Sequence, residues 1–147
     1  MNLILWRHAE AADGAPDPAR ELTAKGIKQA AKIAEFLHRH LPEDHRVLVS
    51  PATRTQQTAS ALTGHFTLAP TIAPGASAQD VLQAARWPDA GDTVLVVGHQ
   101  PTLGEVAAQL LGCGGAVSIK KGSIWWFSQK EGSGQTSLRL VISPDFL

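Results

Sequence analysis

Short apolar runs alternate with longer segments of helical periodicity over most of the chain. The clearest apolar runs are residues 2–6, 47–49 and 93–97. Runs of this length bounded by turn residues are typical of buried strands. The longest helical segment begins after Thr23, a good N-cap residue, and continues through Leu41 to a stop at Pro42. Alternating strands and helices predict an α/β fold, a three-layer sandwich whose mostly parallel central sheet is flanked by helices.

Three shorter helices and one weak strand complete this part of the chain. The helices are predicted from Pro51 to about Thr63 with Ser50 as N-cap, from a Ser77–Asp80 capping box to Pro88, and from Pro101 to a stop at Gly112. The weak strand is 66–68.

The C-terminal part has a different pattern, because two strand-like segments follow each other without a helix between them. Residues 123–129 and 136–143 are joined by the turn-rich segment 130–135, which predicts an antiparallel hairpin. Trp125 and Trp126 must point to opposite faces of a regular strand. We expect one in the core and the other over an edge. The alternating residues Leu138, Leu140 and Ile142 predict one apolar face on the second strand.

Composition narrows the class of protein. A chain of 147 residues fits one domain, 1–147. Lys+Arg and Asp+Glu both number 13, so no basic stripe favours a nucleic acid or an anionic membrane surface. A single cysteine, Cys113, excludes an intramolecular disulfide and a cysteine metal cluster. The N-terminal apolar run is too short to span a membrane and lacks the features of a signal peptide. We therefore expect a cytoplasmic protein with no membrane partner.

Polar side chains follow each of the three clearest apolar runs. Arg7 and His8 follow the first, Ser50 and then Arg54 follow the second, and His99 follows the third. In open parallel sheets, ligands bind beyond the carboxyl ends of the strands. These residues are therefore expected to meet at one edge of the sheet, although they lie far apart in the sequence.

Two histidines and two arginines at one edge suit phosphoryl transfer through a histidine. An arginine fork holds phosphoryl oxygens with a charge that does not titrate away. His8 is the candidate nucleophile, provided that one ring nitrogen faces phosphorus while an acceptor keeps the other protonated. Arg7 would neutralise the approaching charge. His99 would donate to the phosphoryl oxygens, more effectively when protonated.

Other interpretations of these residues remain open. A single histidine at a strand end is more often structural than catalytic, and Arg7 and Arg54 could form ion pairs. The possible acidic partners are Glu10, Glu21 and Glu105. A zinc site that uses the histidines with Glu10, Asp13 or Asp17 is disfavoured, because the adjacent arginines would oppose a bare cation. Four other histidines are assigned no role: His38, His40, His45 and His65.

Four ordered segments resemble motifs of the histidine phosphatase superfamily, which has the phosphoglycerate-mutase-like fold. They are Arg7-His8-Ala9-Glu10, similar to an Arg-His-Gly motif with alanine in place of glycine; 20–26, similar to Arg-x-Leu-Thr-x-x-Gly; 50–58, similar to Ser-Pro-x-x-Arg-x-x-x-Thr; and 98–101, similar to the second-histidine motif. The resemblance spans about Leu3 to Gly112. The short chain and the Arg-His-Ala-Glu form are most similar to SixA-type phosphohistidine phosphatases.

The resemblance implies a role for each matching residue. His8 would be transiently phosphorylated, while Arg7, Arg54 and His99 would bind the phosphoryl group and Arg20 would line the pocket. It also implies that no metal and no other cofactor is required. The expected function is removal of a phosphoryl group from phosphohistidine through an intermediate on His8.

One feature of the larger family members is missing. Those that cleave phosphate esters use a carboxylic acid between the second arginine and the second histidine, but only Asp80, Asp89 and Asp92 lie in this interval, and none is in a recognisable motif. Glu10 or Asp13 could still supply the proton. An imidazole leaves readily once neutral, whereas an alkoxide needs a proton.

The missing acid favours phosphohistidine as the substrate. The short connections favour an open site that admits a phosphohistidine-bearing protein, such as a histidine-phosphotransfer domain. The alternatives are a broad phosphomonoesterase and a phosphoryl-binding module without turnover.

Overall fold

A six-stranded sheet forms the centre of the computed structural model, which describes residues 1–115 and 117–147. The strands lie in the order β3-β2-β4-β1-β5-β6. Their bounds are Asn2–Arg7 (β1), His45–Val49 (β2), Thr67–Leu68 (β3), Thr93–Gly98 (β4), Ile124–Gln129 (β5) and Thr136–Ile142 (β6). The first four are parallel, whereas β5 is antiparallel to β1 and to β6. The predicted mostly parallel sheet with a C-terminal antiparallel hairpin is confirmed.

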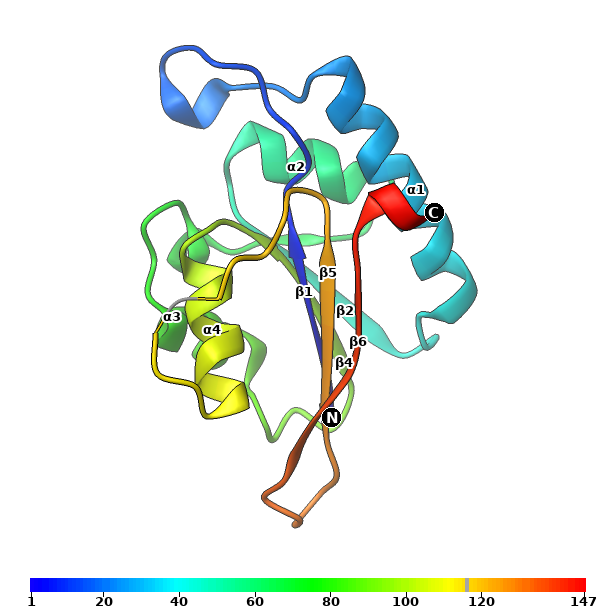
Figure 1. Cartoon of the computed structure of the whole chain (residues 1–147), viewed down its shortest axis with the longest axis vertical. Coiled ribbons are helices and arrows are strands. Elements are labelled where there is room, and N and C mark those ends of the chain that lie inside the picture. The colour runs from blue at the N-terminus through cyan, green and yellow to red at the C-terminus, as the bar shows by residue number, and fades with distance from the viewer. Residues whose placement is uncertain (116) are drawn as a thin grey trace.

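Helices cover both faces of this sheet (Figure 1). The helices are Ala24–His40 (α1), Thr53–Ser60 (α2), Ala78–Ala85 (α3) and Thr102–Leu111 (α4), with short 3-10 turns at Asp17–Ala19, Pro70–Ile72 and Pro144–Phe146. Ile4 and Trp6 of β1 pack in the core under α1 and α2, while Leu3 and Leu5 pack under α3 and α4. Because the middle of β1 is buried on both faces, its residues from Leu3 to Trp6 are all apolar. The predicted three-layer architecture is confirmed.

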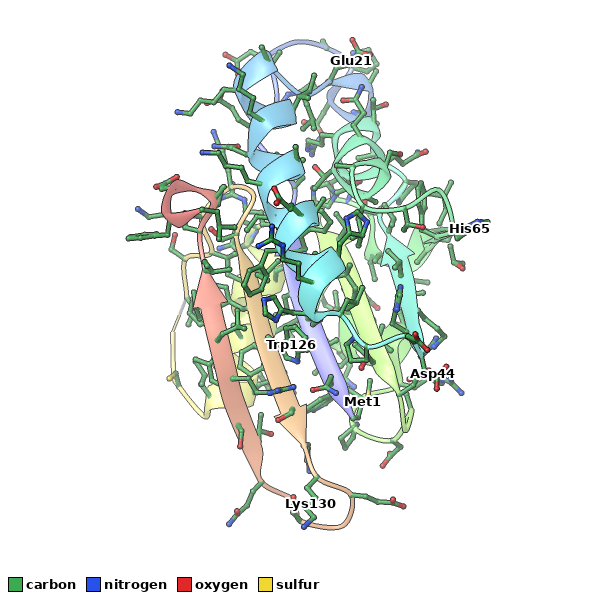
Figure 2. The ribbon with its side chains drawn as sticks, turned by 90° about the vertical axis from the view of Figure 1, so that its right-hand side faces the viewer. Met1, Glu21, Asp44, His65, Trp126 and Lys130 are labelled. Atoms are coloured by element: carbon green, nitrogen blue, oxygen red, sulfur yellow. The ribbon has the colours of Figure 1, made fainter. Side chains whose placement is uncertain are left out.

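The parallel strands end at the same level. In the strand register, Arg7 lies opposite Gly98, and Val49 lies opposite Val97. The residues that follow β1, β2 and β4 therefore share one edge of the sheet. Glu21, in the loop beyond this edge, lies at the end of the molecule opposite Met1 and Lys130 (Figure 2). Among residues 1–115 and 117–147, no helix has the length and apolar character needed to cross a membrane.

Most helix boundaries follow the predicted caps. The Thr23 hydroxyl accepts a hydrogen bond from Gly26 N, and Ser77 and Asp80 form the reciprocal capping box. The prediction for α2 is wrong at both ends: it begins at Thr53 after Ala52 and ends at Ser60. Ser50 does not cap it, because its hydroxyl is engaged elsewhere, as described below.

The hairpin is confirmed, with one departure in its second strand. Trp126 lies in the core under α1 (Figure 2), and Trp125 packs on the opposite face of the sheet. Leu140 and Ile142 pack against the α1 side of the core, as expected. Leu138 does not join them and is 40% exposed, because a register shift between Trp126 and Phe127 interrupts the alternation.

Candidate active site

His8 is held rigidly just past the end of β1. Its backbone N–H donates to Gly98 O at 3.1 Å, and its own carbonyl accepts from Gly122 N at 3.1 Å. The ring nitrogen Nδ1 lies 2.7 Å from Ala9 O. A carbonyl only accepts hydrogen bonds, so Nδ1 carries the ring hydrogen and Nε2 keeps a free lone pair. The tautomer is the one that a nucleophilic Nε2 requires.

The backbone after His8 is anchored by α1 and α2. Ala9 N donates to the Thr58 hydroxyl at 3.1 Å, and Glu10 N donates to the side-chain oxygen of Gln29 at 2.9 Å. Gly26 permits the approach of α1, because a Cβ at this position would clash with the Glu10 carbonyl. Helix packing therefore fixes the carbonyl that sets the tautomer of His8.

Arg7 and Arg54 each use their terminal nitrogens for structural contacts. Nη1 of Arg7 donates to Ile119 O at 2.8 Å. Arg54 is 5% exposed; its Nη1 donates to Asp17 O at 2.9 Å and its Nη2 to Asp17 Oδ2 at 3.1 Å. In both residues, Nε is buried and has no hydrogen-bond partner in the described part of the chain. The Nε edge of each guanidinium is thus left for another acceptor.

His99 lies beside His8, with 5.4 Å between the ring centroids. Its Nε2 is 2.7 Å from the Ser50 hydroxyl. The oxygen of this hydroxyl accepts from Ala52 N at 3.4 Å, which leaves its hydrogen for Nε2 of His99. We therefore assign the ring hydrogen to Nδ1, which is buried and unpartnered among residues 1–115 and 117–147.

Within residues 1–115 and 117–147, three buried donors at this edge thus have no partner: Arg7 Nε at the end of β1, Arg54 Nε in α2 after β2, and His99 Nδ1 after β4. Leaving a buried donor unsatisfied costs about 1–3 kcal/mol, so three in one place indicate a site that a ligand completes. A tetrahedral phosphoryl group offers three terminal oxygens as acceptors. The chemistry of the donor set therefore fits an anion and not a cation.

Both imidazoles are neutral in the free protein. Burial is the largest cause that lowers the pKa of His8 to about 4; the hydrogen bond to Ala9 raises it, and the Arg54, Arg7 and Arg20 charges lower it further. Burial is also the largest cause that lowers the pKa of His99 to about 3. The sequence predicted that His99 would act best when protonated. The structure does not require this, because the neutral ring already has a hydrogen on Nδ1 to donate.

These lowered pKa values predict a distinctive titration. The His8 ring should stay neutral as the pH falls through 6.5, its ordinary pKa, and should protonate only near pH 4. The unfolded chain binds those protons earlier, so folding stability should decrease as the pH falls from about 6.5 to about 4. NMR titration of the ring signals and urea unfolding across this window measure both effects. A His8 midpoint near 6.5 would contradict the described environment.

Asp17 forms hydrogen bonds with two arginines near the site, Arg20 and Arg54. Its carboxylate accepts from Arg20 Nη1 at 3.0 Å as well as from Arg54, and Arg20 Nε donates to Ala12 O at 2.8 Å. Hydrogen bonds from Arg20 and then Arg54 hold the pKa of Asp17 below its ordinary value. Sequence reasoning considered Asp17 only as a zinc ligand, although its position three residues before Arg20 was a signal of pairing. No group of three possible ligands for a metal occurs in residues 1–115 and 117–147.

Replacing Asp17 with alanine should reduce kcat/KM about 10-fold, because Arg54 loses the acceptor that orients its terminal nitrogens. Asp17→Asn keeps an acceptor and should have a smaller effect. Asp13→Ala is the matched control, since Asp13 is exposed in the same loop. Steady-state kinetics on one phosphorylated substrate compare the three variants. Equal kinetics for Asp17→Ala and Asp13→Ala would show that the Asp17 bridge has no positioning role.

The carboxylates that could donate a proton are mostly engaged elsewhere. Glu10 Oε2 accepts from the Thr23 hydroxyl at 2.8 Å, and Asp13 is exposed. Asp80 is held in its capping box, and Asp92 pairs with Arg46 at 3.2 Å near the amino ends of β2 and β4. Asp89 lines a pocket with Met1 at that same end of the sheet. The three acids between the second arginine and the second histidine thus lie in a helix cap (Asp80) or at the end of the sheet opposite His8 (Asp89 and Asp92).

The chain is similar to known proteins both in sequence and in fold. Residues 3–81 match the model of the histidine phosphatase superfamily, branch 1. A phosphohistidine phosphatase SixA homolog of Haemophilus influenzae is 34% identical over 140 residues, which cover 84% of this chain and 85% of the relative. Phosphohistidine phosphatase SixA of Escherichia coli is 32% identical over 75% of this chain and 74% of its own. The structure of the protein histidine phosphatase SixA complexed with tungstate superposes with a TM-score of 0.85 at 28% identity, covering 99% of both chains.

Proposed function

Because the chain belongs to the histidine phosphatase superfamily, we propose that it removes the phosphoryl group from phosphohistidine on a protein, through a covalent intermediate on His8. The observation that carries this proposal is the set of three unpartnered donors around a histidine whose Nε2 is free. SixA relatives are named phosphohistidine phosphatases, and one was solved with tungstate, a tetrahedral oxyanion. Both facts support a site for a phosphoryl group in this chain.

In the first step, the lone pair of His8 Nε2 forms a bond to phosphorus while the bond from phosphorus to the substrate imidazole breaks. A substrate ring that is protonated on its other nitrogen leaves as neutral imidazole, so the enzyme need not supply a proton. Arg7 Nε, Arg54 Nε and His99 Nδ1 meet the phosphoryl oxygens, where negative charge is held. The hydrogen bond from Nδ1 to Ala9 O stabilises the positive ring of the phosphorylated His8.

In the second step, water attacks phosphorus and Nε2 leaves with its electron pair. The His8 ring returns to its neutral form with the Nδ1 hydrogen in place, and the water proton passes to phosphate or solvent. Phosphorus is thus bonded first to the substrate imidazole, then to the imidazole of His8, and finally to the oxygen of the attacking water. Neither step, as written, takes a proton from a carboxylic acid of the protein, and neither uses a metal.

The proposed substrate follows from whether the leaving group needs a proton. Hydrolysis of a phosphate monoester releases an alkoxide, which needs a proton from an acid, whereas a phosphohistidine ring that carries its own proton needs none. The connection from β3 to β4 holds only the short turn Pro70–Ile72 and α3. A short connection of this kind, without a longer insertion, suits a histidine displayed on another protein, such as a histidine-phosphotransfer domain.

Purified protein should therefore dephosphorylate a phosphohistidine-bearing histidine-phosphotransfer domain much faster than a glycolytic phosphate ester. Release of inorganic phosphate from both substrates under the same conditions measures the ratio. Equal or faster hydrolysis of the ester would favour a broad phosphomonoesterase. Tight phosphate binding with no release from either substrate would favour a binding module.

A further inference from the structure

A second surface feature lies beside the candidate active site, where β5 begins and β6 ends. It is a groove of about 540 Å³ whose apolar wall includes Trp125, Val141 and Phe146. Ser123 and Lys120 also line it. Phe146 is 82% exposed and Val141 is 46% exposed, so two large apolar side chains face solvent at one place. We call this feature the hairpin groove.

The hairpin groove and the active site share one stretch of backbone. Ser123 O accepts from Arg7 N at 3.1 Å, and Ile119 O accepts from the Arg7 side chain. In the strand register, Trp6 of β1 lies opposite Ile124 of β5, and Ile124 lies opposite Ile142 of β6. These three residues are therefore at the same height in the sheet. The segment before β5 and the end of β6 both reach the end of the sheet where β1 stops (Figure 1). Two strand spacings place the groove about 10 Å from the end of β1.

The groove also contains a polar group that lacks a partner. The Ser123 side chain is 2% exposed, and its hydroxyl has no hydrogen-bond partner within residues 1–115 and 117–147. A buried hydroxyl of this kind indicates that something else completes the site. Lys120 and the neighbouring Lys121 are both exposed, and no carboxylate is among the described residues that line the groove. The combination fits an apolar side chain accompanied by a carboxylate.

We propose that the hairpin groove is the docking surface for the protein that carries the phosphohistidine. The occupant is an apolar side chain of that protein, with a neighbouring acidic residue facing Lys120. This inference rests on the proposed function. A standard interface buries about 800 Å² on each partner, which corresponds to a disc of about 16 Å radius. A protein whose phosphohistidine reaches His8 therefore extends far enough to cover a groove about 10 Å away.

The test compares a small substrate with a protein substrate on the same variants. The variants are Phe146→Ala, Val141→Glu and Lys120→Glu, and Leu68→Glu is the matched control because Leu68 is an exposed apolar residue on the opposite edge strand. The substrates are phosphoramidate and a phosphorylated histidine-phosphotransfer domain. We expect each groove variant to keep kcat/KM on phosphoramidate within about 2-fold and to lose about 10-fold or more on the phosphoprotein. Leu68→Glu should lose neither.

Each contrary result has a separate meaning. Wild-type protein that hydrolyses phosphoramidate but not the phosphoprotein would overturn both the docking surface and the proposed protein substrate. Unchanged phosphoprotein turnover in all three groove variants would overturn the docking surface alone. Equal losses on both substrates would show that the groove supports the fold and does not dock a partner. The groove would be assigned to self-association instead if the wild-type protein is a dimer in analytical ultracentrifugation, the groove variants are monomers, and phosphoprotein turnover is unchanged.

Discussion

Replacing His8 with alanine should lower phosphohistidine turnover at least about 10⁴-fold, to the uncatalysed background. The reason is that, in the proposed mechanism, His8 Nε2 is the group that accepts the phosphoryl group. The three donors around it can still bind an anion, so phosphate or vanadate binding should persist in this variant. Steady-state release of phosphate and equilibrium binding of vanadate measure the two properties separately.

His38→Ala is the matched control for this variant. His38 is an exposed histidine whose ring nitrogen also contacts a backbone carbonyl, that of Leu62 at 2.8 Å, but it lies on α1 away from the strand ends. Its replacement should leave turnover near that of the wild type. Substantial activity in His8→Ala would refute the nucleophile assigned here.

Arg54→Ala should reduce kcat/KM about 10³-fold. The Arg54 guanidinium is buried, and its Nε is one of the three donors that have no partner among the described residues. Its positive charge should stabilise the negative phosphoryl group in the transition state. Arg54→Lys should recover only part of the loss, because an ammonium cannot donate to Asp17 and to the phosphoryl group through separate edges of one planar fork. Kinetics on phosphoramidate, which needs no protein docking, isolate this effect.

Arg46→Ala is the control that separates a loss of catalysis from a loss of stability in Arg54→Ala. Arg46 forms a partly buried ion pair with Asp92 at the opposite end of the sheet, so its removal should lower stability without changing kcat. Thermal unfolding of both variants provides the reference. If Arg54→Ala loses no more activity than Arg46→Ala, Arg54 is a structural residue and the phosphoryl site is wrongly assigned.

The sequence was most informative where one physical cause dominated. Apolar runs buried on both faces identified β1 and β4, and helical spacing with Thr23 and Gly112 at the ends identified α1 and α4. The strand-end rule brought His8 and His99 to one edge of the sheet, and the structure places their rings 5.4 Å apart.

Prediction failed where a side chain had two competing partners. Ser50 has the sequence context of an N-cap, yet its hydroxyl contacts His99, which is 49 residues away in the sequence. The same holds for Asp17: its pairing with Arg54 depends on how the loop after β1 folds back over α2. Local pattern could not rank such contacts, because the distance that decides them exists only in the folded chain. The role of the Ile119 carbonyl in holding Arg7 had no side-chain signal at all.

The neutral state of the two histidines clarifies how charge is arranged. With the pKa of His8 lowered to about 4 and that of His99 to about 3, the arginines provide the positive charge of the site. A neutral His8 can attack without first losing a proton. In the proposed mechanism, the guanidinium charges stabilise the phosphoryl group and do not change with pH, because arginine stays protonated.

The phosphoenzyme is the most direct test of the central claim that His8 is the covalent nucleophile. Protein mixed with a ³²P-labelled phosphohistidine substrate and quenched rapidly should carry label that is labile to acid and stable to base, as expected for a phosphorus–nitrogen bond. Peptide mapping should place this label on His8 in the wild type, and His8→Ala should carry none. Label on another residue, or acid-labile label that persists in His8→Ala, would contradict the account.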